Sequence, residues 1–223
     1  MTVENGVERI VSEGPVLLDL DGSIARLRLN RPDASNGVSI DLLRTLYDVI
    51  MTCHGDPRIR AVVLTGEGPN FCAGGDVKEF ASKGAGLPDF LRKATAYLQI
   101  SASALMRLDV PVIAAVQGYA AGGGGLGLVC AADVVIAAKS SKFMAGATRV
   151  GMAPDAGVTV ILPRLVGFRR AMDIVLSNRV IGADEALDIG LITRVVPDED
   201  LEAATMEYAN TLAAGAPKAL GAT

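Results

Sequence analysis

Apolar and polar positions first alternate with a period of two and then change to a helical period. In residues 24–29, every second residue is apolar, which predicts a strand with one buried and one solvated face. Residues 16–19 form a second apolar run just before it. The Asp21-Gly22 pair lies between the two runs and predicts a hairpin.

From residue 39 onward, apolar residues recur at every third or fourth position. Ser39 precedes this run and Asp41 falls in its first turn, so Ser39 is expected to cap a helix that ends near Gly55. The same reasoning predicts strands at 61–65, 112–116, 134–137 and 193–196, and helices at 77–80, 87–108, 158–165, 168–176, 183–189 and 201–214. Strands and helices that alternate without a linker predict a single α/β domain over residues 15–223. Residues 1–14 are expected to form a flexible leader.

The composition excludes several classes of protein. With 21 Lys and Arg, 25 Asp and Glu and only 4% aromatic residues, the chain has neither a general basic charge nor a base-stacking platform, so nucleic acid is not expected as a partner. The 3 cysteines (Cys53, Cys72 and Cys130) and 1 histidine are too few for a zinc site, and no metal is expected. They are interpreted as reduced, packed thiols of a cytoplasmic protein. The acidic start lacks a signal-peptide core, and no apolar run is long enough to cross a membrane.

Two glycine clusters carry the candidate chemistry. The first is Ala73-Gly74-Gly75-Asp76 and the second is Gly122–Gly125, and each lies between a predicted strand and a predicted helix. Glycines there allow a ligand to approach the backbone, and the first N–H groups of the following helix are free to bind it. Two such N–H groups that converge on one oxygen atom would form an oxyanion hole. The alternative is that the glycines only permit tight packing of a helix against a strand.

The second cluster also matches the GxGxxG pattern of dinucleotide-binding folds through Gly122, Gly124 and Gly127. That pattern requires an acidic residue about 20 positions further on. Asp133 is too near and Asp155 is too far, so a dinucleotide site is not expected. The chain also lacks the GK[ST] sequence of a phosphate-binding loop.

Several motifs, in this order and spacing, resemble the crotonase superfamily of enoyl-CoA hydratases and isomerases. They extend from about residue 16 to the end of the chain and include Asn30-Arg31-Pro32, residues 71–80, residues 111–124, residues 151–157, residues 162–167 and residues 186–192. The resemblance implies an α/β fold, a spiral of ββα modules with a helical C-terminal region. Family members usually carry further helices beyond the point where this chain ends, so that region is expected to be incomplete.

The resemblance also implies an acyl-CoA substrate, no cofactor besides the coenzyme A of that substrate, and assembly as a homotrimer or hexamer. The backbone N–H groups of Ala73 and Gly123 would bind the thioester oxygen, on which negative charge develops during the reaction. The substrate-binding residues that it implies are Asp33, Ala34, Ser35, Ala73, Gly74, Gly75, Asp76, Val77 and Gly123.

Hydratases of this family activate water with two glutamates, and both are missing here. Leu126 and Ala147 stand at the matching positions, and neither side chain can carry a proton. Asp155 matches the acid of several acyl-CoA isomerases, and a similarly placed aspartate is the nucleophile of chlorobenzoyl-CoA dehalogenases. A single carboxylate can move a proton from one carbon to another, which is allylic isomerisation. Asp155 could instead only cap the following helix.

Three functions therefore remain open from the sequence. The first is an enoyl-CoA isomerase with Asp155 as its acid/base. The second is an enoyl-CoA hydratase with atypical catalytic residues. The third is an acyl-CoA-binding protein without turnover. Leu126, Ala147 and Asp155 are the residues that distinguish these three hypotheses.

Overall fold

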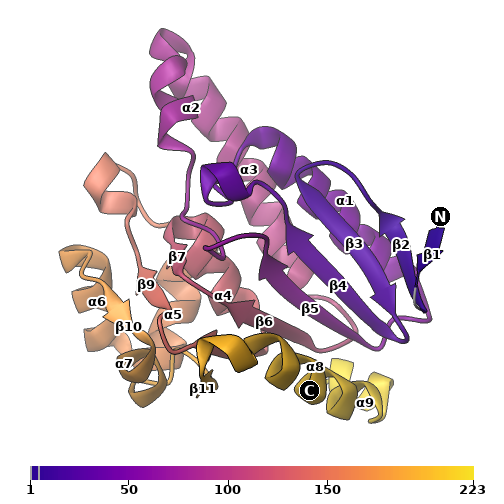
Figure 1. Cartoon of the computed structure of the whole chain (residues 1–223). Coiled ribbons are helices and arrows are strands. Elements are labelled where there is room, and N and C mark those ends of the chain that lie inside the picture. Colours follow the sequence, from indigo (N-terminus) through magenta and orange to yellow (C-terminus); the bar gives the residue numbers. More distant parts are fainter. Residues whose placement is uncertain (1, 5) are drawn as a thin grey trace.

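The computed structural model describes residues 2–4 and 6–223 and has a mixed α/β architecture (Figure 1). Within these residues, an 8-stranded sheet has the order β1-β2-β3-β4-β5-β6-β8-β11, and a 3-stranded sheet has the order β10-β9-β7. The strands are β1 (Thr2–Glu4), β2 (Val7–Val11), β3 (Val16–Asp21), β4 (Ile24–Leu29), β5 (Ala61–Gly66), β6 (Val112–Val116), β7 (Tyr119–Ala121), β8 (Val134–Ala138), β9 (Lys142–Met144), β10 (Ile181–Gly182) and β11 (Arg194–Val196).

The large sheet is antiparallel at its start and parallel from β4 onward. β3 and β4 form the expected hairpin, with Asp21 paired to Ile24 and with Gly22 at a φ of 60° in the tight turn. β4 then pairs in parallel with β5, β5 with β6, β6 with β8, and β8 with β11. Parallel neighbours need crossover connections, and the helices of the chain provide them.

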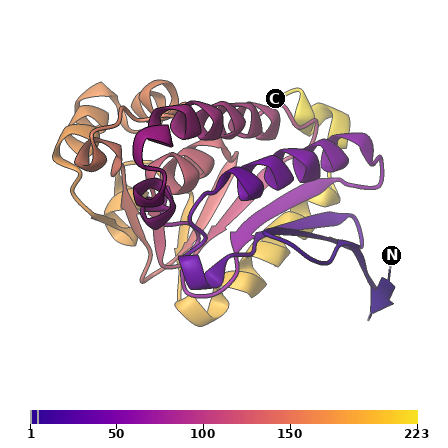
Figure 2. The same cartoon turned by 90° about the horizontal axis from the view of Figure 1, so that it is seen from above.

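Helices cover both faces of the large sheet. The main ones are α1 (Ile40–Gly55), α2 (Val77–Ser82), α3 (Leu87–Leu105), α4 (Leu128–Ala131), α5 (Val158–Val166), α6 (Phe168–Ser177), α7 (Ala183–Asp188), α8 (Leu201–Ala213) and α9 (Pro217–Gly221). Figure 2 shows α1 and α3 on one side of the sheet and α8 on the other. A large hydrophobic cluster fills the α1 and α3 side, and a smaller one lies under α8. Crossovers and two covered faces are typical of an α/β fold, so the predicted fold class is confirmed.

The N-terminal segment differs from the expectation. β2 pairs antiparallel with β3 and is itself paired with β1, so Val7–Val11 is an ordered part of the sheet. This corrects the expected flexible leader over residues 1–14, although residues 1 and 5 lie outside the described residues. The weak sequence pattern explains the error, because β2 lies next to the edge strand β1, is only partly buried, and mixes apolar and charged residues without clean alternation.

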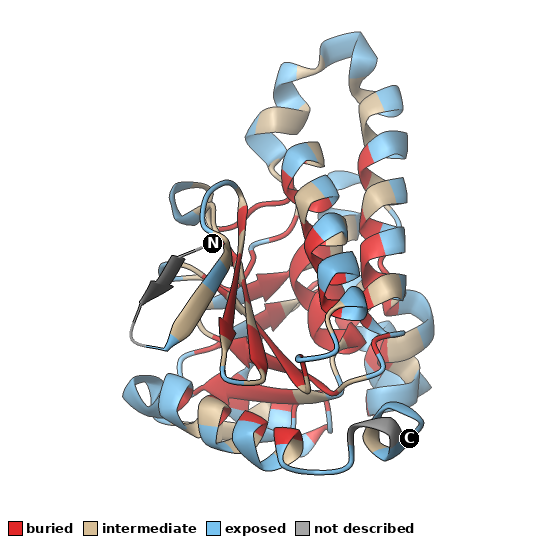
Figure 3. Cartoon of the chain, turned by 90° about the vertical axis from the view of Figure 1, so that its right-hand side faces the viewer, coloured by how far each residue is buried: buried red, intermediate tan, exposed pale blue. Residues whose placement is uncertain are grey.

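Short elements that the sequence pattern missed surround the glycine-rich segments. These are β7, β9 and β10, the π-helical segment η3 (Gly123–Gly127), and the 3-10 helices η1 (Pro32–Ala34), η2 (Gly84–Gly86), η4 (Ala147–Val150) and η5 (Asp198–Asp200). Figure 3 shows that α2 and the adjoining start of α3 extend away from the buried sheet. Of the helices that the structure describes, none is long and apolar enough to cross a membrane.

Candidate active site

A cavity of about 220 Å³ lies where the two glycine clusters meet. Its wall is formed by residues 73–75, by residues 121–124, by α2 and α3, and by the segment around η4. The two clusters touch, since a Cβ atom on Gly122 would lie 3.4 Å from the Cα atom of Gly74. The wall is mostly apolar, and Asp155 is the one acidic side chain among the described residues that line it.

The glycines of the second cluster have different roles. Gly124 and Gly125 serve packing, because a Cβ atom on Gly124 would lie 2.5 Å from Val38 and one on Gly125 only 2.7 Å from the carbonyl carbon of Ala120. Gly123 instead leaves room for a functional group. A Cβ atom on Gly123 would overlap the Oδ1 atom of Asp155 and would lie 2.8 Å from its Cγ atom. Tight packing, the alternative role that the sequence left open, therefore applies to Gly124 and Gly125. Gly123 instead makes room for Asp155 at the cavity.

Asp155 is a half-buried carboxyl group beside Gly123, a residue whose backbone N–H has no helical partner. Gly123 is the first residue of η3, so its N–H group makes no hydrogen bond within that segment. Burial raises the pKa of Asp155, and a hydrogen bond with its own backbone N–H opposes this effect only in part. A carboxyl group with a raised pKa exchanges protons more readily near neutral pH than an ordinary aspartate does.

Asp155 does not cap the following helix. α5 begins at Val158 and its N-cap is Gly157, with no hydrogen bond from any side chain at that cap. Only the backbone carbonyl of Asp155 takes part, since it accepts a hydrogen bond of 3.0 Å from Val158 N–H. The capping alternative is therefore wrong, and the carboxyl group is left facing the cavity.

The hydrogen bonds of the first cluster bear on the role expected of Ala73. The N–H group of Ala73 donates to the carbonyl oxygen of Ser35 at 2.9 Å, so it is not free to bind a thioester oxygen in this structure. Gly75 lies in an isolated β-bridge in which Gly74 O accepts one hydrogen bond and Asp76 N–H donates the other. The N–H group of Gly75 itself has no acceptor among the described residues. Gly75 is therefore a second candidate donor in this cluster. Sequence alone could not identify it, because the choice depends on a carbonyl group from a distant loop.

The expected substrate-binding residues divide into two groups. Ala73, Gly74, Gly75, Val77 and Gly123 line the cavity. Asp33 and Ala34 lie in η1 and Ser35 follows it, and all three lie outside the cavity wall. Ser35 is still connected to the site, through its carbonyl oxygen and through a hydroxyl group that accepts a hydrogen bond of 3.2 Å from Asn70.

Asp76 does not line the cavity, and its carboxyl group is bound by neighbouring protein groups. Its Oδ1 atom accepts a hydrogen bond of 3.1 Å from Glu79 N–H and so caps α2, and its Oδ2 atom lies 3.0 Å from Nη2 of Arg31. Burial alone would raise the pKa of Asp76, but these hydrogen bonds hold it below its usual range. The geometry therefore favours capping and an ion pair over the expected substrate contact.

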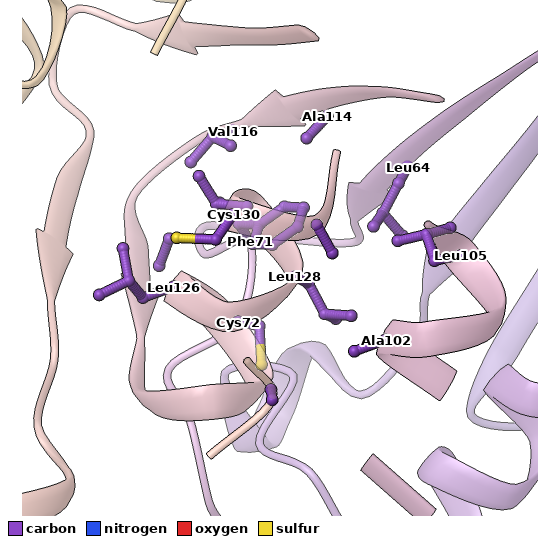
Figure 4. Packing of buried hydrophobic residues seen from close by; sticks show 14 of the residues in the cluster. Leu64, Phe71, Cys72, Ala102, Leu105, Ala114, Val116, Leu126, Leu128 and Cys130 are labelled. Carbon is purple, nitrogen blue, oxygen red and sulfur yellow. The ribbon is translucent and has the colours of Figure 1, made fainter. Parts of the chain in front are cut away.

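The two positions at which hydratases of the family carry glutamates lie in different parts of the structure. Ala147 lines the cavity, at the start of η4. Leu126 is fully buried and lies in the hydrophobic cluster of Figure 4 with Phe71, Val116 and Cys130. A carboxylate at position 126 would have to be placed in this apolar core, which is energetically unfavourable.

Sequence reasoning missed the side chains that close the cavity. Phe80 of α2 and Leu98 of α3 line it, together with Thr95, Arg149 and Met152. The helical periodicity of α3 predicted that Leu98 faces inward, but no sequence pattern predicted that it lines this cavity. Arg149 lies in η4, a 3-10 segment that the apolar pattern did not predict.

None of the three cysteines lines the cavity. Cys53, Cys72 and Cys130 are buried and free, and burial raises the pKa of each thiol to about 12. A thiol with such a pKa is protonated at neutral pH and is a poor nucleophile. No group of His, Cys, Asp and Glu side chains among the described residues is arranged to hold a metal ion.

Comparison with known proteins places this site in a family. Residues 19–223 match the model of the enoyl-CoA hydratase/isomerase family. A probable enoyl-CoA hydratase from Rhodobacter capsulatus is 41% identical over 204 residues, which cover 92% of this chain and 77% of that protein. The 1,2-epoxyphenylacetyl-CoA isomerase of Escherichia coli is 34% identical over 199 residues, which cover 89% of this chain and 76% of that protein.

Solved structures agree with the sequence relatives. The crystal structure of an enoyl-CoA hydratase from Bacillus anthracis superposes with a TM-score of 0.88 at 34% identity, covering 93% of this chain and 80% of that one. The fold, the glycine-lined cavity and these relatives lead to one conclusion. The chain belongs to the enoyl-CoA hydratase/isomerase family, in the crotonase superfamily, and is an acyl-CoA enzyme.

Proposed function

We propose that this protein isomerises an enoyl-CoA, with Asp155 as the acid and base that moves the proton. In a β,γ-enoyl-CoA, the carboxylate of Asp155 removes a proton from the carbon next to the thioester carbonyl. The electron pair of that C–H bond spreads over the double bond and the thioester oxygen. Asp155, now protonated, returns the same proton to the γ-carbon, which gives the α,β-enoyl-CoA and regenerates the carboxylate.

The thioester oxygen becomes negative in this reaction and needs preorganised donors. The N–H groups of Gly75 and Gly123 are the donors that we propose, since both residues line the cavity. The N–H group of Gly75 has no acceptor among the described residues, and that of Gly123 makes no hydrogen bond within η3. One such donor contributes about 2.7–4 kcal/mol to transition-state stabilisation in enzymes where it has been removed.

The observation that carries this proposal is the position of Asp155 against Gly123 in a cavity that holds no second acidic side chain among the described residues. One acid/base suffices for a proton transfer between two carbons. Hydration needs a further group to orient and activate water, and Leu126 and Ala147 supply none. The likeness to an isomerase of 1,2-epoxyphenylacetyl-CoA supports the same reading.

Hydration with atypical residues is the second candidate, because the relative at 41% identity bears the name of a probable enoyl-CoA hydratase. Mass spectrometry in deuterated water separates the two reactions. Isomerisation of a β,γ-enoyl-CoA can exchange deuterium at carbon but adds no water, whereas hydration of an α,β-enoyl-CoA gives a product heavier by one water molecule. Binding of thioesters with neither change would indicate a binding protein without turnover.

The substitution Asp155→Asn tests the proposed residue. Asn keeps the shape of the side chain but cannot exchange a proton as a carboxyl group does, so turnover is expected to fall by at least about 10²-fold. Affinity for a saturated acyl-CoA, measured by calorimetry, is expected to stay nearly unchanged. Wild-type turnover in the Asn variant would overturn the isomerase proposal, because no other acidic side chain among the described residues lines the cavity.

We also propose that the protein assembles as a homotrimer or hexamer. Large apolar side chains on α5 and α6 are exposed, including Val160, Leu165, Phe168, Met172 and Leu176. Because α5 and α6 pack against each other, these exposed side chains lie on neighbouring helices, and a group of exposed apolar residues commonly marks a protein–protein contact. Light scattering at micromolar concentration tests the proposal, and a stable monomer would contradict it.

A further inference from the structure

A single cationic side chain lines the cavity that holds Asp155. Among the described residues of the cavity wall, Arg149 alone carries a positive charge, and the other side chains apart from Asp155 and Thr95 are apolar. Thr95 already donates its hydroxyl group to the carbonyl oxygens of α3, at 2.9 Å to Leu91. Arg149, an exposed residue, is therefore the one charged donor group that the wall offers to a substrate besides the backbone.

The guanidinium group of Arg149 is held in place but is not neutralised. Its Nη2 atom donates to the carbonyl oxygen of Asn178 at 3.1 Å, and its backbone N–H donates to Gly146 O at 3.1 Å. No carboxylate among the described residues forms an ion pair with it. A guanidinium group has five N–H donors in a fixed fork that fits a carboxylate, so most of its donors remain free.

Arg149 does not serve Asp155. The two side chains form no ion pair, and a nearby cation would lower the pKa of that carboxyl group. Burial instead raises the pKa of Asp155, and no cation contributes to it. Asp155 and Arg149 thus line the same cavity without forming an ion pair with each other.

We propose that Arg149 selects acyl-CoA substrates whose acyl group ends in a carboxylate, that is, mono-thioesters of dicarboxylic acids. This inference rests on the proposed acyl-CoA function of the same cavity. The thioester end of such a substrate lies at the glycine clusters, and its distal carboxylate pairs with the guanidinium group of Arg149. An apolar chain end at this place would leave the guanidinium group without an anion and would gain no charge-assisted hydrogen bond.

Binding of unreactive thioesters tests this proposal without any turnover. Isothermal calorimetry compares hexanoyl-CoA with adipoyl-CoA, which has the same number of carbons and a terminal carboxylate. We expect adipoyl-CoA to bind about three- to fivefold more tightly, because its terminal carboxylate can accept hydrogen bonds from the guanidinium group, while the exposure of Arg149 screens part of the attraction. Succinyl-CoA and suberoyl-CoA, each with the monocarboxylic thioester of equal length, extend the series and give the preferred chain length.

The variant Arg149→Met keeps the length of the apolar stem and removes the charge. It is expected to abolish the preference for adipoyl-CoA and to leave hexanoyl-CoA affinity within about twofold, because only the charged contact is lost. Arg170→Met is the matched control, since Arg170 is an exposed arginine of α6 outside the cavity wall. The thermal melting temperature of each variant shows whether loss of the Asn178 contact has disturbed the fold.

The possible results separate this inference from the proposed function. If wild-type protein binds hexanoyl-CoA as tightly as adipoyl-CoA, the selectivity proposal is wrong while the acyl-CoA function stands. If Arg149→Met weakens both thioesters equally, Arg149 binds the coenzyme A part, and the proposal is again wrong. If neither thioester binds to the wild-type protein, the proposed function of the cavity itself fails. Selectivity for adipoyl-CoA that disappears only in Arg149→Met supports the proposal.

Discussion

The two glycine clusters look alike in sequence but use their glycines in different ways. In residues 73–75, the fold engages the N–H group of Ala73 with Ser35 and leaves that of Gly75 free. In residues 122–125, Gly124 and Gly125 permit close packing, whereas Gly123 makes room for the carboxyl group of Asp155. A glycine-rich motif therefore contains both packing and chemical positions, and only the neighbours of each missing Cβ atom distinguish them.

Gly123→Ala is expected to have the largest effect on activity. Its new Cβ atom would overlap Asp155 Oδ1 and would approach Leu98 to 2.9 Å, so the carboxyl group must leave its position. Losing an aligned acid/base and disturbing one oxyanion donor should lower kcat/KM by about 10³-fold or more. Steady-state kinetics measures this loss.

The same variant should remain folded, because the atoms that the Cβ atom meets belong to side chains that can move. Circular dichroism and a melting curve provide this control. Activity within tenfold of wild type would show that the carboxyl group can act from a second position, and it would weaken the contrast between Gly123 and its neighbours.

Gly125→Ala is expected to affect stability instead. A Cβ atom there would lie 2.7 Å from the carbonyl carbon and 3.0 Å from the Cα atom of Ala120, and these backbone atoms cannot rotate away. Overpacking of this kind costs about 3 kcal/mol, which exceeds the gain of about 1 kcal/mol from replacing glycine in a helix. The free energy of unfolding, from urea titration, should fall accordingly.

Gly55→Ala is the matched control for this experiment. Gly55 is the last residue of α1, and a Cβ atom there would meet nothing within 4 Å. Its free energy of unfolding should equal or slightly exceed that of wild type. Equal stability of the Gly125 and Gly55 variants would contradict the packing role of Gly125.

Gly75→Ala should have a small effect, although Gly75 belongs to the proposed oxyanion hole. Its Cβ atom would meet the ring of Phe80 at 2.5 Å, which is the far end of a half-buried side chain on the exposed α2 segment. The ring can shift, and the backbone N–H remains. We expect kcat/KM to fall by less than about tenfold, compared with about 10²–10³-fold for loss of a donor.

Nuclear magnetic resonance sharpens the comparison of Gly75 with Ala73. On binding of a saturated acyl-CoA, the amide protons of Gly75 and Gly123 should shift more than that of Ala73, whose N–H already donates to Ser35. A larger shift at Ala73 would mean that the Ser35 contact opens on binding and would restore the donor expected from the sequence.

Much of the fold was predictable, because it depends on strong local patterns. Alternation predicted β4, the Asp21-Gly22 pair predicted the hairpin, and Ser39 caps α1 as expected, with its side chain accepting a hydrogen bond from Leu42 N–H. β2 was missed, since a partly buried strand beside the edge of the sheet needs no clean apolar alternation.

The site was predictable only as a set of segments. Motif resemblance identified residues 73–75, Gly123 and Asp155, and all of them line one cavity. Which N–H group is free depends on the loop at Ser35, and the orientation of Leu126 into the core depends on how η3 packs. Contacts between segments far apart in the sequence decide both, and no local pattern encodes them.

The smallest expected effect is a rise in stability when Asp155 is replaced by Asn. Burial raises the pKa of Asp155 in the folded protein above its value in the unfolded chain, which is about 3.9. The folded state therefore holds the proton more tightly, and the contribution of Asp155 to stability is fully present below the unfolded pKa. That contribution is lost as the pH rises through the raised folded pKa.

Asp155→Asn removes this loss, because the amide stays neutral at every pH. Its melting temperature should exceed that of wild type slightly near neutral pH, and the difference should shrink as the pH is lowered toward the folded pKa of Asp155. Replacement of a buried functional group commonly stabilises a protein while it lowers activity. Melting curves at a series of pH values test this, with Gly55→Ala as a variant whose difference from wild type should not depend on pH. A lower melting temperature for Asp155→Asn at all pH values would mean that the carboxylate makes a stabilising contact, and the cavity around Gly123 would then be a structural rather than a catalytic feature.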